Sequence, residues 1–140
     1  KCHCGNLSFS LNWEPDPATI PARTCGCAFC IKHGGIWTSH RDGLLKIVIR
    51  EPAFLSMYEV GSKTAQFHIC ARCGVVPVVT SCIDGKMYAV VSVNAFEGVD
   101  RSLIRPSPAD FEGEQQHDRL ARRQRNWIAN VEYVAAEGSR

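Results

Sequence analysis

Seven of the eight cysteines lie in three short clusters, and thiolates at such close spacing are ligands for a soft divalent metal such as zinc. In chain order the clusters are Cys2 with Cys4, then Cys25 with Cys27 and Cys30, and then Cys70 with Cys73. A structural zinc takes four protein ligands, whereas a catalytic zinc keeps three and leaves one position for water or substrate. The outer pairs together supply four sulfurs and the middle cluster supplies three. This arithmetic predicts one closed structural site and one open site with a possible catalytic role.

The local spacing supports the same division. Side chains of an extended segment alternate between two faces, so the two cysteines of the first pair are expected to point the same way. The last pair needs a tight turn, and Gly5 and Gly74 follow their pairs at positions where a positive φ is useful. The middle cluster combines both devices, because Cys25 and Cys27 share a face and Cys30 returns through a turn. Three sulfurs on one side of an ion leave its opposite side free.

Two other interpretations of the cysteines stay open at this stage. Disulfides are disfavoured, because Cys-x-Cys spacing strains the preferred disulfide geometry and the sequence shows no apolar leader segment. The stronger alternative is two structural zincs, in which a further residue completes the middle cluster. The candidates for that fourth ligand are His33, His40, His68 and Cys82. Cys82 lies in an apolar, strand-like stretch, so it is otherwise expected to be a buried, inert thiol.

Length and charge limit the classes of protein. A chain of 140 residues fits one domain, expected over residues 1–140, with a modest core that metal sites can reinforce. The net charge of +2 does not by itself indicate a nucleic-acid partner. No apolar run approaches the eighteen or so residues of a membrane span. Thiolate sites persist most easily in a reducing compartment, so the cytoplasm is the expected location. The oligomeric state is not determined by these features.

Most of the chain has the pattern of short β-strands. Apolar residues alternate with polar ones between turn signals, which predicts strands at 7–11, 36–40, 44–49, 54–60, 65–70, 75–81 and 87–93. The last two of these flank Asp84-Gly85, which is typical of a hairpin turn. The sequence contains neither an internal repeat nor a second domain. One mostly β domain is therefore predicted.

The C-terminal part has helical periodicity instead. From about residue 115 to 131, Leu120, Trp127 and Val131 recur at helical spacing, and Trp127 is expected to anchor the helix on the sheet. The remaining faces of this helix carry Arg119, Arg122, Arg123 and Arg125. Because the overall charge is near neutral, we interpret this basic run as a solvated helix face. A nucleic-acid patch is the alternative, but stacking aromatics interleaved with basic residues are lacking.

The order of the motifs resembles a known family. Cys-x-Cys-Gly at residues 2–5, Cys-x-Cys-x-x-Cys at 25–30 with Gly34 following, and Phe-His-Ile-Cys-Ala-Arg-Cys-Gly at 67–74 are similar to the glutathione-dependent formaldehyde-activating enzyme family. That family also contains centromere-protein-V-like members. The resemblance covers nearly the whole chain. It implies an Mss4-like, zinc-binding fold with two layers of β-sheet, a structural zinc on the outer cysteine pairs and a catalytic zinc on the middle cluster.

The resemblance also implies an activity. Family members are carbon–sulfur lyases that handle thiol–aldehyde adducts such as S-(hydroxymethyl)glutathione, so glutathione and formaldehyde are the expected small-molecule partners. Zinc removes the proton of a thiol whose free pKa is about 8.5. Three thiolates already give the centre a charge of about minus one, which makes it a weak Lewis acid, so thiolate delivery is favoured over carbonyl activation. Lys32 and Arg72 are candidates for binding the carboxylates of glutathione. The alternative function is a non-catalytic zinc scaffold that binds a protein or a polymer.

Overall fold

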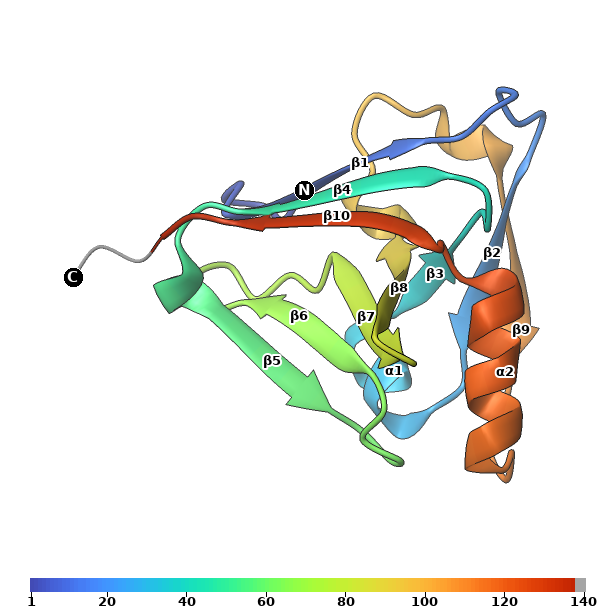
Figure 1. Cartoon of the computed structure of the whole chain (residues 1–140). Helices are drawn as coiled ribbons and strands as arrows, with labels where there is room; N and C mark the ends of the chain where they lie inside the picture. Colours follow the sequence, from blue (N-terminus) through green and yellow to red (C-terminus); the bar gives the residue numbers. More distant parts are fainter. Residues whose placement is uncertain (138–140) are drawn as a thin grey trace.

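Two β-sheets are the main secondary structure of the protein, which is described here from a computed structural model over residues 1–137 (Figure 1). The three-stranded sheet has the order β1 (Leu7–Asn12), β4 (Leu44–Ile49) and β10 (Asn130–Ala135). The seven-stranded sheet has the order β5 (Leu55–Glu59), β6 (Gln66–Cys70), β7 (Val78–Ile83), β8 (Lys86–Ser92), β3 (Ile36–Thr38), β2 (Ile20–Cys25) and β9 (Ile104–Ala109). Two α-helices, α1 (Ala28–His33) and α2 (Gln116–Asn126), and three short 3-10 helices, Pro52–Phe54, Val93–Ala95 and Arg101–Leu103, complete it. The predicted mostly β fold with two sheets and a C-terminal helix is confirmed.

The small sheet packs one face on the core. β1 is antiparallel to β4, and β10 is parallel to β4 at the other edge. Along β4, Leu45, Ile47 and Ile49 are buried while the residues between them are exposed or half-buried. This alternation is the period of two that a half-buried strand requires. Burying each of these side chains contributes about 1.5–3 kcal/mol relative to leaving it exposed.

The hairpin of β7 and β8 supplies two separate cores. Its turn is Asp84-Gly85, as predicted, with φ angles of 51° and 76°. Val78 and Val91 pack into the cluster shared with β1 and β4, whereas their neighbours Val79 and Val90 pack into a second cluster on the opposite face of the sheet. Because successive side chains point to opposite faces, one hairpin lies between both cores. This explains why nearly every residue of the two strands is buried.

The C-terminal segment differs from the sequence prediction. The helix α2 ends at Asn126, and Val131 lies in β10 instead of on the helix. Trp127, directly after the helix, is buried in the second core cluster and anchors α2 there as expected. The backbone groups of Ile128 form a bridge with Ala89 of β8, which starts the return of the chain to the small sheet.

The strands β2 and β9 were not predicted, because both contain proline. They pair in parallel, with Pro21 opposite Arg105 and Ala22 opposite Pro106. β9 is an edge strand, where the missing N–H of a proline leaves no ladder partner unsatisfied. Among residues 1–137, no helix is long and apolar enough to cross a membrane.

Candidate metal centres

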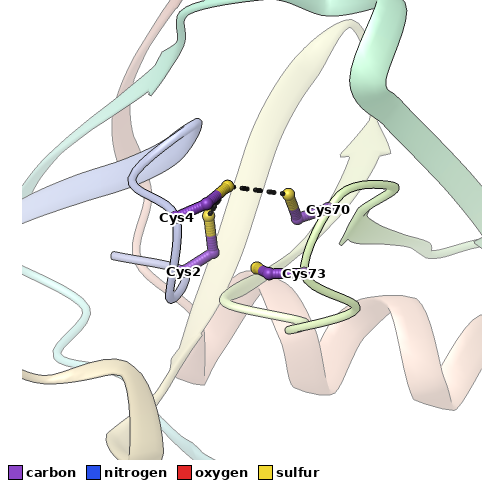
Figure 2. Close-up of side chains that lie close together, drawn as sticks. All are labelled: Cys2, Cys4, Cys70 and Cys73. Carbon is purple, nitrogen blue, oxygen red and sulfur yellow. Dashed lines mark hydrogen bonds between the residues drawn. The ribbon is translucent and has the colours of Figure 1, made fainter.

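The four outer cysteines converge on one point, as the ligand count predicted. Figure 2 shows Cys2 and Cys4 on the N-terminal loop facing Cys70, the last residue of β6, and Cys73 on the loop that follows. All four sulfurs lie within 4.8 Å of one another. The Sγ–Sγ distance is 3.8 Å from Cys2 to Cys4 and 3.5 Å from Cys4 to Cys70. A tetrahedral ion with Zn–S bonds of about 2.3 Å has sulfurs about 3.8 Å apart, so the arrangement fits zinc. We call these residues the four-cysteine cluster.

Two tight turns build the four-cysteine cluster. The first pair was expected on an extended segment, but residues 2–5 form a turn, in which Gly5 N–H donates to the Cys2 carbonyl over 3.1 Å. The second turn is one residue longer, and its Gly74 N–H donates to the Cys70 carbonyl over 2.8 Å. Gly5 and Gly74 have φ angles of 85° and 80°, a region that glycine enters without strain. The predicted use of a positive φ at both glycines is therefore confirmed.

Hydrogen bonds tie the first turn to the rest of the domain. The buried side chain of Asn6 accepts from the Glu51 N–H over 2.8 Å and donates to the Glu51 carbonyl over 3.2 Å. The N–H of Leu7 donates to the Cys2 sulfur over 3.3 Å. Cys2 and Cys70 have no exposed surface. The cluster therefore joins the N-terminal turn to β6 inside the first core.

The middle cysteines form the second centre, which we call the three-cysteine cluster. Cys25 is the last residue of β2, Cys27 precedes α1, and Cys30 lies in the first turn of that helix. Their sulfurs lie within 4.8 Å of one another. The expected turn is thus helical: the Cys27 sulfur caps α1 by accepting the Cys30 N–H over 3.3 Å. Gly34 ends the helix with a φ of 73°, and its N–H donates to the Cys30 carbonyl.

Proximity of the sulfurs changes their acidity. A hydrogen bond with the Cys30 thiol lowers the pKa of Cys25 to about 5, against the opposing effect of burial. The same hydrogen bond, together with burial, raises the pKa of Cys30. Cysteines bind a metal as thiolates. Because one cysteine of this cluster is already a thiolate at neutral pH, metal binding releases fewer protons than it would from three thiols.

No fourth protein ligand completes the three-cysteine cluster within residues 1–137. No other Cys, His, Asp or Glu ligand atom of this range lies within 4.8 Å of all three sulfurs. The His33 ring packs against the neighbouring Phe29 at a centroid distance of 4.5 Å. His40 is stacked on Trp13, and His68 is buried with its ring hydrogen-bonded to the Tyr133 hydroxyl. The three-ligand arrangement predicted from the sequence is what the described chain offers.

The remaining cysteine is neither a ligand nor buried. Cys82 was expected to be an inert core thiol, but it is exposed, because it lies on the outer face near the end of β7. All eight cysteines lie within the described residues, and none forms a disulfide.

A cavity of about 510 Å³ opens beside the three-cysteine cluster. Its apolar walls include Trp37, Phe67, Val79, Val90 and Trp127, from both the central hairpin and its neighbours. Four arginines also line it, Arg23, Arg119, Arg122 and Arg123. This combination of apolar walls and a few charged groups is typical of a small-molecule site.

The two cations predicted to bind glutathione do not line this cavity. Lys32 is exposed on α1. Arg72 lies beside the four-cysteine cluster, where its guanidinium pairs with Glu51 at 3.2 Å and covers the Phe54 ring at 4.1 Å. The structure thus places both residues outside the lining of this cavity.

The arginines of α2 were misinterpreted as a solvated helix face. The side chains of Arg119 and Arg122 are 19% and 15% exposed, and Arg123 is buried. Only Arg125 of this run is exposed as expected. The spacing contained a usable signal, because residues 119, 122 and 123 follow the i, i+3, i+4 pattern of one helix face. Arg23 had a similar signal, since it lies two residues before Cys25 on the same face of a strand.

Comparisons with known proteins add a fold relationship but no function. No family model matches the chain, and no curated protein matches it. A crystal structure described only as that of a Rhodobacter sphaeroides protein is similar, with a TM-score of 0.56 and 28% sequence identity. The similarity covers 77% of this chain and 96% of that protein.

Proposed function

We propose that the protein is a zinc-dependent carbon–sulfur lyase of the glutathione-dependent formaldehyde-activating type, acting on a thiol–aldehyde adduct. One observation carries this proposal: three sulfurs converge beside a cavity, and no further ligand within residues 1–137 completes them. A group of four sulfurs elsewhere in the same chain makes the contrast meaningful, because the two groups offer the ligand numbers of a structural and of a catalytic zinc. We assign zinc to both clusters, one ion in each.

The roles of the residues follow from their positions. Cys25, Cys27 and Cys30 would hold the ion, and zinc bound there supplies a position at which a substrate thiol is kept as its thiolate. Trp37 and Phe67 line the cavity and would shield the substrate sulfur from water. In the lyase direction the C–S bond of the hydroxymethyl adduct breaks, its electron pair stays on sulfur, and the hydroxyl loses its proton as the aldehyde forms. The reverse reaction joins thiol and aldehyde without any oxidant or reductant.

The proposal also includes the cellular location of the protein. Thiolates that bind metal are kept reduced in the cytoplasm, and the eight cysteines are free thiols in the structure. We therefore place the protein there, with a small thiol and a small aldehyde as its partners.

The proposal is tested by a thiol titration of the protein loaded with cobalt, whose absorption reports the number of thiolate ligands. Adding glutathione or a smaller thiol should increase the sulfur-to-cobalt absorption, and the exchange of formaldehyde with the thiol should exceed the spontaneous rate. Because the spontaneous reaction is itself quick, exchange is measured at equilibrium by NMR line broadening. The control is Cys27→Ser, which removes a ligand from the open cluster only. Absence of a spectral response to every thiol contradicts the proposal.

A further inference from the structure

The cavity beside the three-cysteine cluster contains more positive charge than its carboxylates neutralise. Glu114 pairs with Arg119 at 3.4 Å and with Arg122 at 3.0 Å, so these two guanidiniums share one carboxylate. Arg122 also lies over the Phe111 ring at 3.5 Å. The other two arginines of the cavity, Arg23 and Arg123, have no carboxylate partner within residues 1–137. Their surroundings decide what the cavity can bind.

Arg123 is a buried cation with neutral partners. It is 8% exposed, and its Nη1 donates to Thr64 Oγ1 over 2.8 Å and to Ser81 Oγ over 3.2 Å. Its Nε is buried and makes no hydrogen bond within residues 1–137. Burial lowers the pKa of Arg123 to about 10, so the side chain is still charged at neutral pH. A buried charge without a counter-ion is costly, and a bound anion would offset that cost.

Arg23 extends the positive region towards the three-cysteine cluster. Its Nη2 donates to Ser39 Oγ, a neutral group, over 3.0 Å, and its side chain is also near the Cys25 thiolate. Arg23 and Cys25 both belong to β2, and side chains two apart on a strand share a face. An anion held by Arg23 therefore lies on the same side of the strand as the sulfur of Cys25.

The acidic residues of the cavity are placed differently. Asp110 and Glu112 also line it, but both are exposed, and Asp110 Oδ1 accepts the N–H of Glu112 over 2.9 Å. Solvent and salt screen these exposed carboxylates more strongly than the buried guanidinium of Arg123. Near the buried guanidinium of Arg123, the cavity thus attracts an anion and repels a ligand ammonium group.

The apolar walls limit the rest of the ligand. Trp37, Phe67, Val79, Val90 and Trp127 offer large apolar surface. Peptide amides placed against such walls lose their hydrogen bonds to water without replacement, which costs free energy. A hydrocarbon chain suits them. The charges and the walls together describe a ligand with an acidic end and an apolar body.

We propose that the substrate is a small thiol acid, whose carboxylate binds Arg23 and Arg123 while its sulfur reaches the three-cysteine cluster. This inference rests on the proposed function, because it assumes that the substrate is a thiol. It goes further in assigning the anion site to β2 and α2, and in preferring a thiol that lacks an ammonium group and peptide bonds.

Matched thiols test the anion site in the protein loaded with cobalt. We compare 3-mercaptopropionate, which has a carboxylate, with 3-mercaptopropanol, which has a hydroxyl in its place. Charge-assisted hydrogen bonds should make the acid bind about ten- to hundredfold more tightly. In Arg123→Gln and Arg23→Gln that preference should fall, while the affinity for the alcohol stays constant. Arg125→Gln is the control, because this arginine is exposed and does not line the cavity.

Several results would overturn the anion site. The first is that the wild-type protein binds the two thiols with equal affinity. The second is that glutathione or cysteamine binds more tightly than the acid. The third is that both arginine variants keep the wild-type preference for the acid over the alcohol. Should Arg123→Gln not fold, Arg23→Gln alone decides the comparison.

A test without sulfur separates this inference from the proposed function. Butyrate should change the tryptophan fluorescence of the zinc-loaded protein saturably, and less so in Arg23→Gln.

If no thiol alters the cobalt spectrum but butyrate binds through Arg23, the lyase proposal fails and the anion site stands. If butyrate does not bind and the two thiols bind equally, the anion site fails and the open thiol site stands.

Discussion

Replacing a single cysteine should affect folding differently in the two clusters. Cys73 is one of four ligands that join the N-terminal turn to the end of β6, so Cys73→Ser should sharply reduce soluble, folded protein. Cys27→Ser should leave the fold largely intact while abolishing thiol-dependent activity. Thermal unfolding and soluble yield measure both effects, with Cys82→Ser as a control at an exposed thiol. Equal loss of structure in the two variants would make the three-cysteine cluster structural and remove the main support for an enzyme.

Gly35 is a second residue whose replacement should affect the three-cysteine cluster. A Cβ at this position would lie 2.9 Å from Trp37 Nε1 and 3.1 Å from Cys30 Cβ, so Gly35→Ala must displace one of them. Overpacking of this kind costs about 1–3 kcal/mol of stability. We expect the variant to lose its more labile zinc to a chelator faster than the wild type. Gly26→Ala is the control inside the same cluster, because its nearest contact would be an ordinary 3.4 Å. Identical zinc-release rates in the two variants would contradict this expectation.

At the scale of elements, a polar contact links β10 to the large sheet, beside the packing of Val131 and Tyr133 on the first core. The Tyr133 hydroxyl of β10 lies 3.1 Å from His68 Nε2 of β6, and His68 is buried. Tyr133→Phe leaves that ring nitrogen without a partner, which should lower the free energy of unfolding by about 1–3 kcal/mol. Denaturant unfolding measures the change, and Tyr58→Phe is the control on an exposed tyrosine of β5. A loss equal to that of Tyr58→Phe would mean that the contact does not stabilise β10.

Elements were predictable where the sequence pattern is local. Asp84-Gly85 specified the hairpin because the turn chemistry is contained in two residues. The helix α1 was missed because six residues are too few to show helical periodicity, and its cap is Cys27. The strand β10 was missed because Val131 continues the apolar spacing of α2, although the chain turns at Trp127. Pairing of β2 with β9 depends on contacts distant in sequence, which no local pattern contains.

The same distinction holds for the candidate sites. Counting ligands predicted both cysteine clusters, because thiolate number and spacing decide coordination. The predicted cations, Lys32 and Arg72, were chosen by their position in the sequence beside the cysteines, and neither lines the cavity. The cavity instead takes its arginines from α2 and from β2. The sequence alone does not show that α2 packs beside the three-cysteine cluster, so its arginines could not be assigned to the cavity.

For the molecule as a whole, the two clusters predict unequal zinc stability. Freshly purified, reduced protein should contain up to two zinc ions, and the ion with three protein ligands should be lost to a chelator much more readily. Removing the second ion should unfold the domain, because structural zinc contributes about 10–16 kcal/mol in small zinc-finger peptides and here joins the N-terminal turn to β6. Zinc analysis and circular dichroism recorded along one chelator titration measure both steps. Cys27→Ser should show only the second step, since its labile site is removed. Two zincs of equal resistance, released together with the fold, would mean that both sites are structural and that the cavity does not serve zinc chemistry.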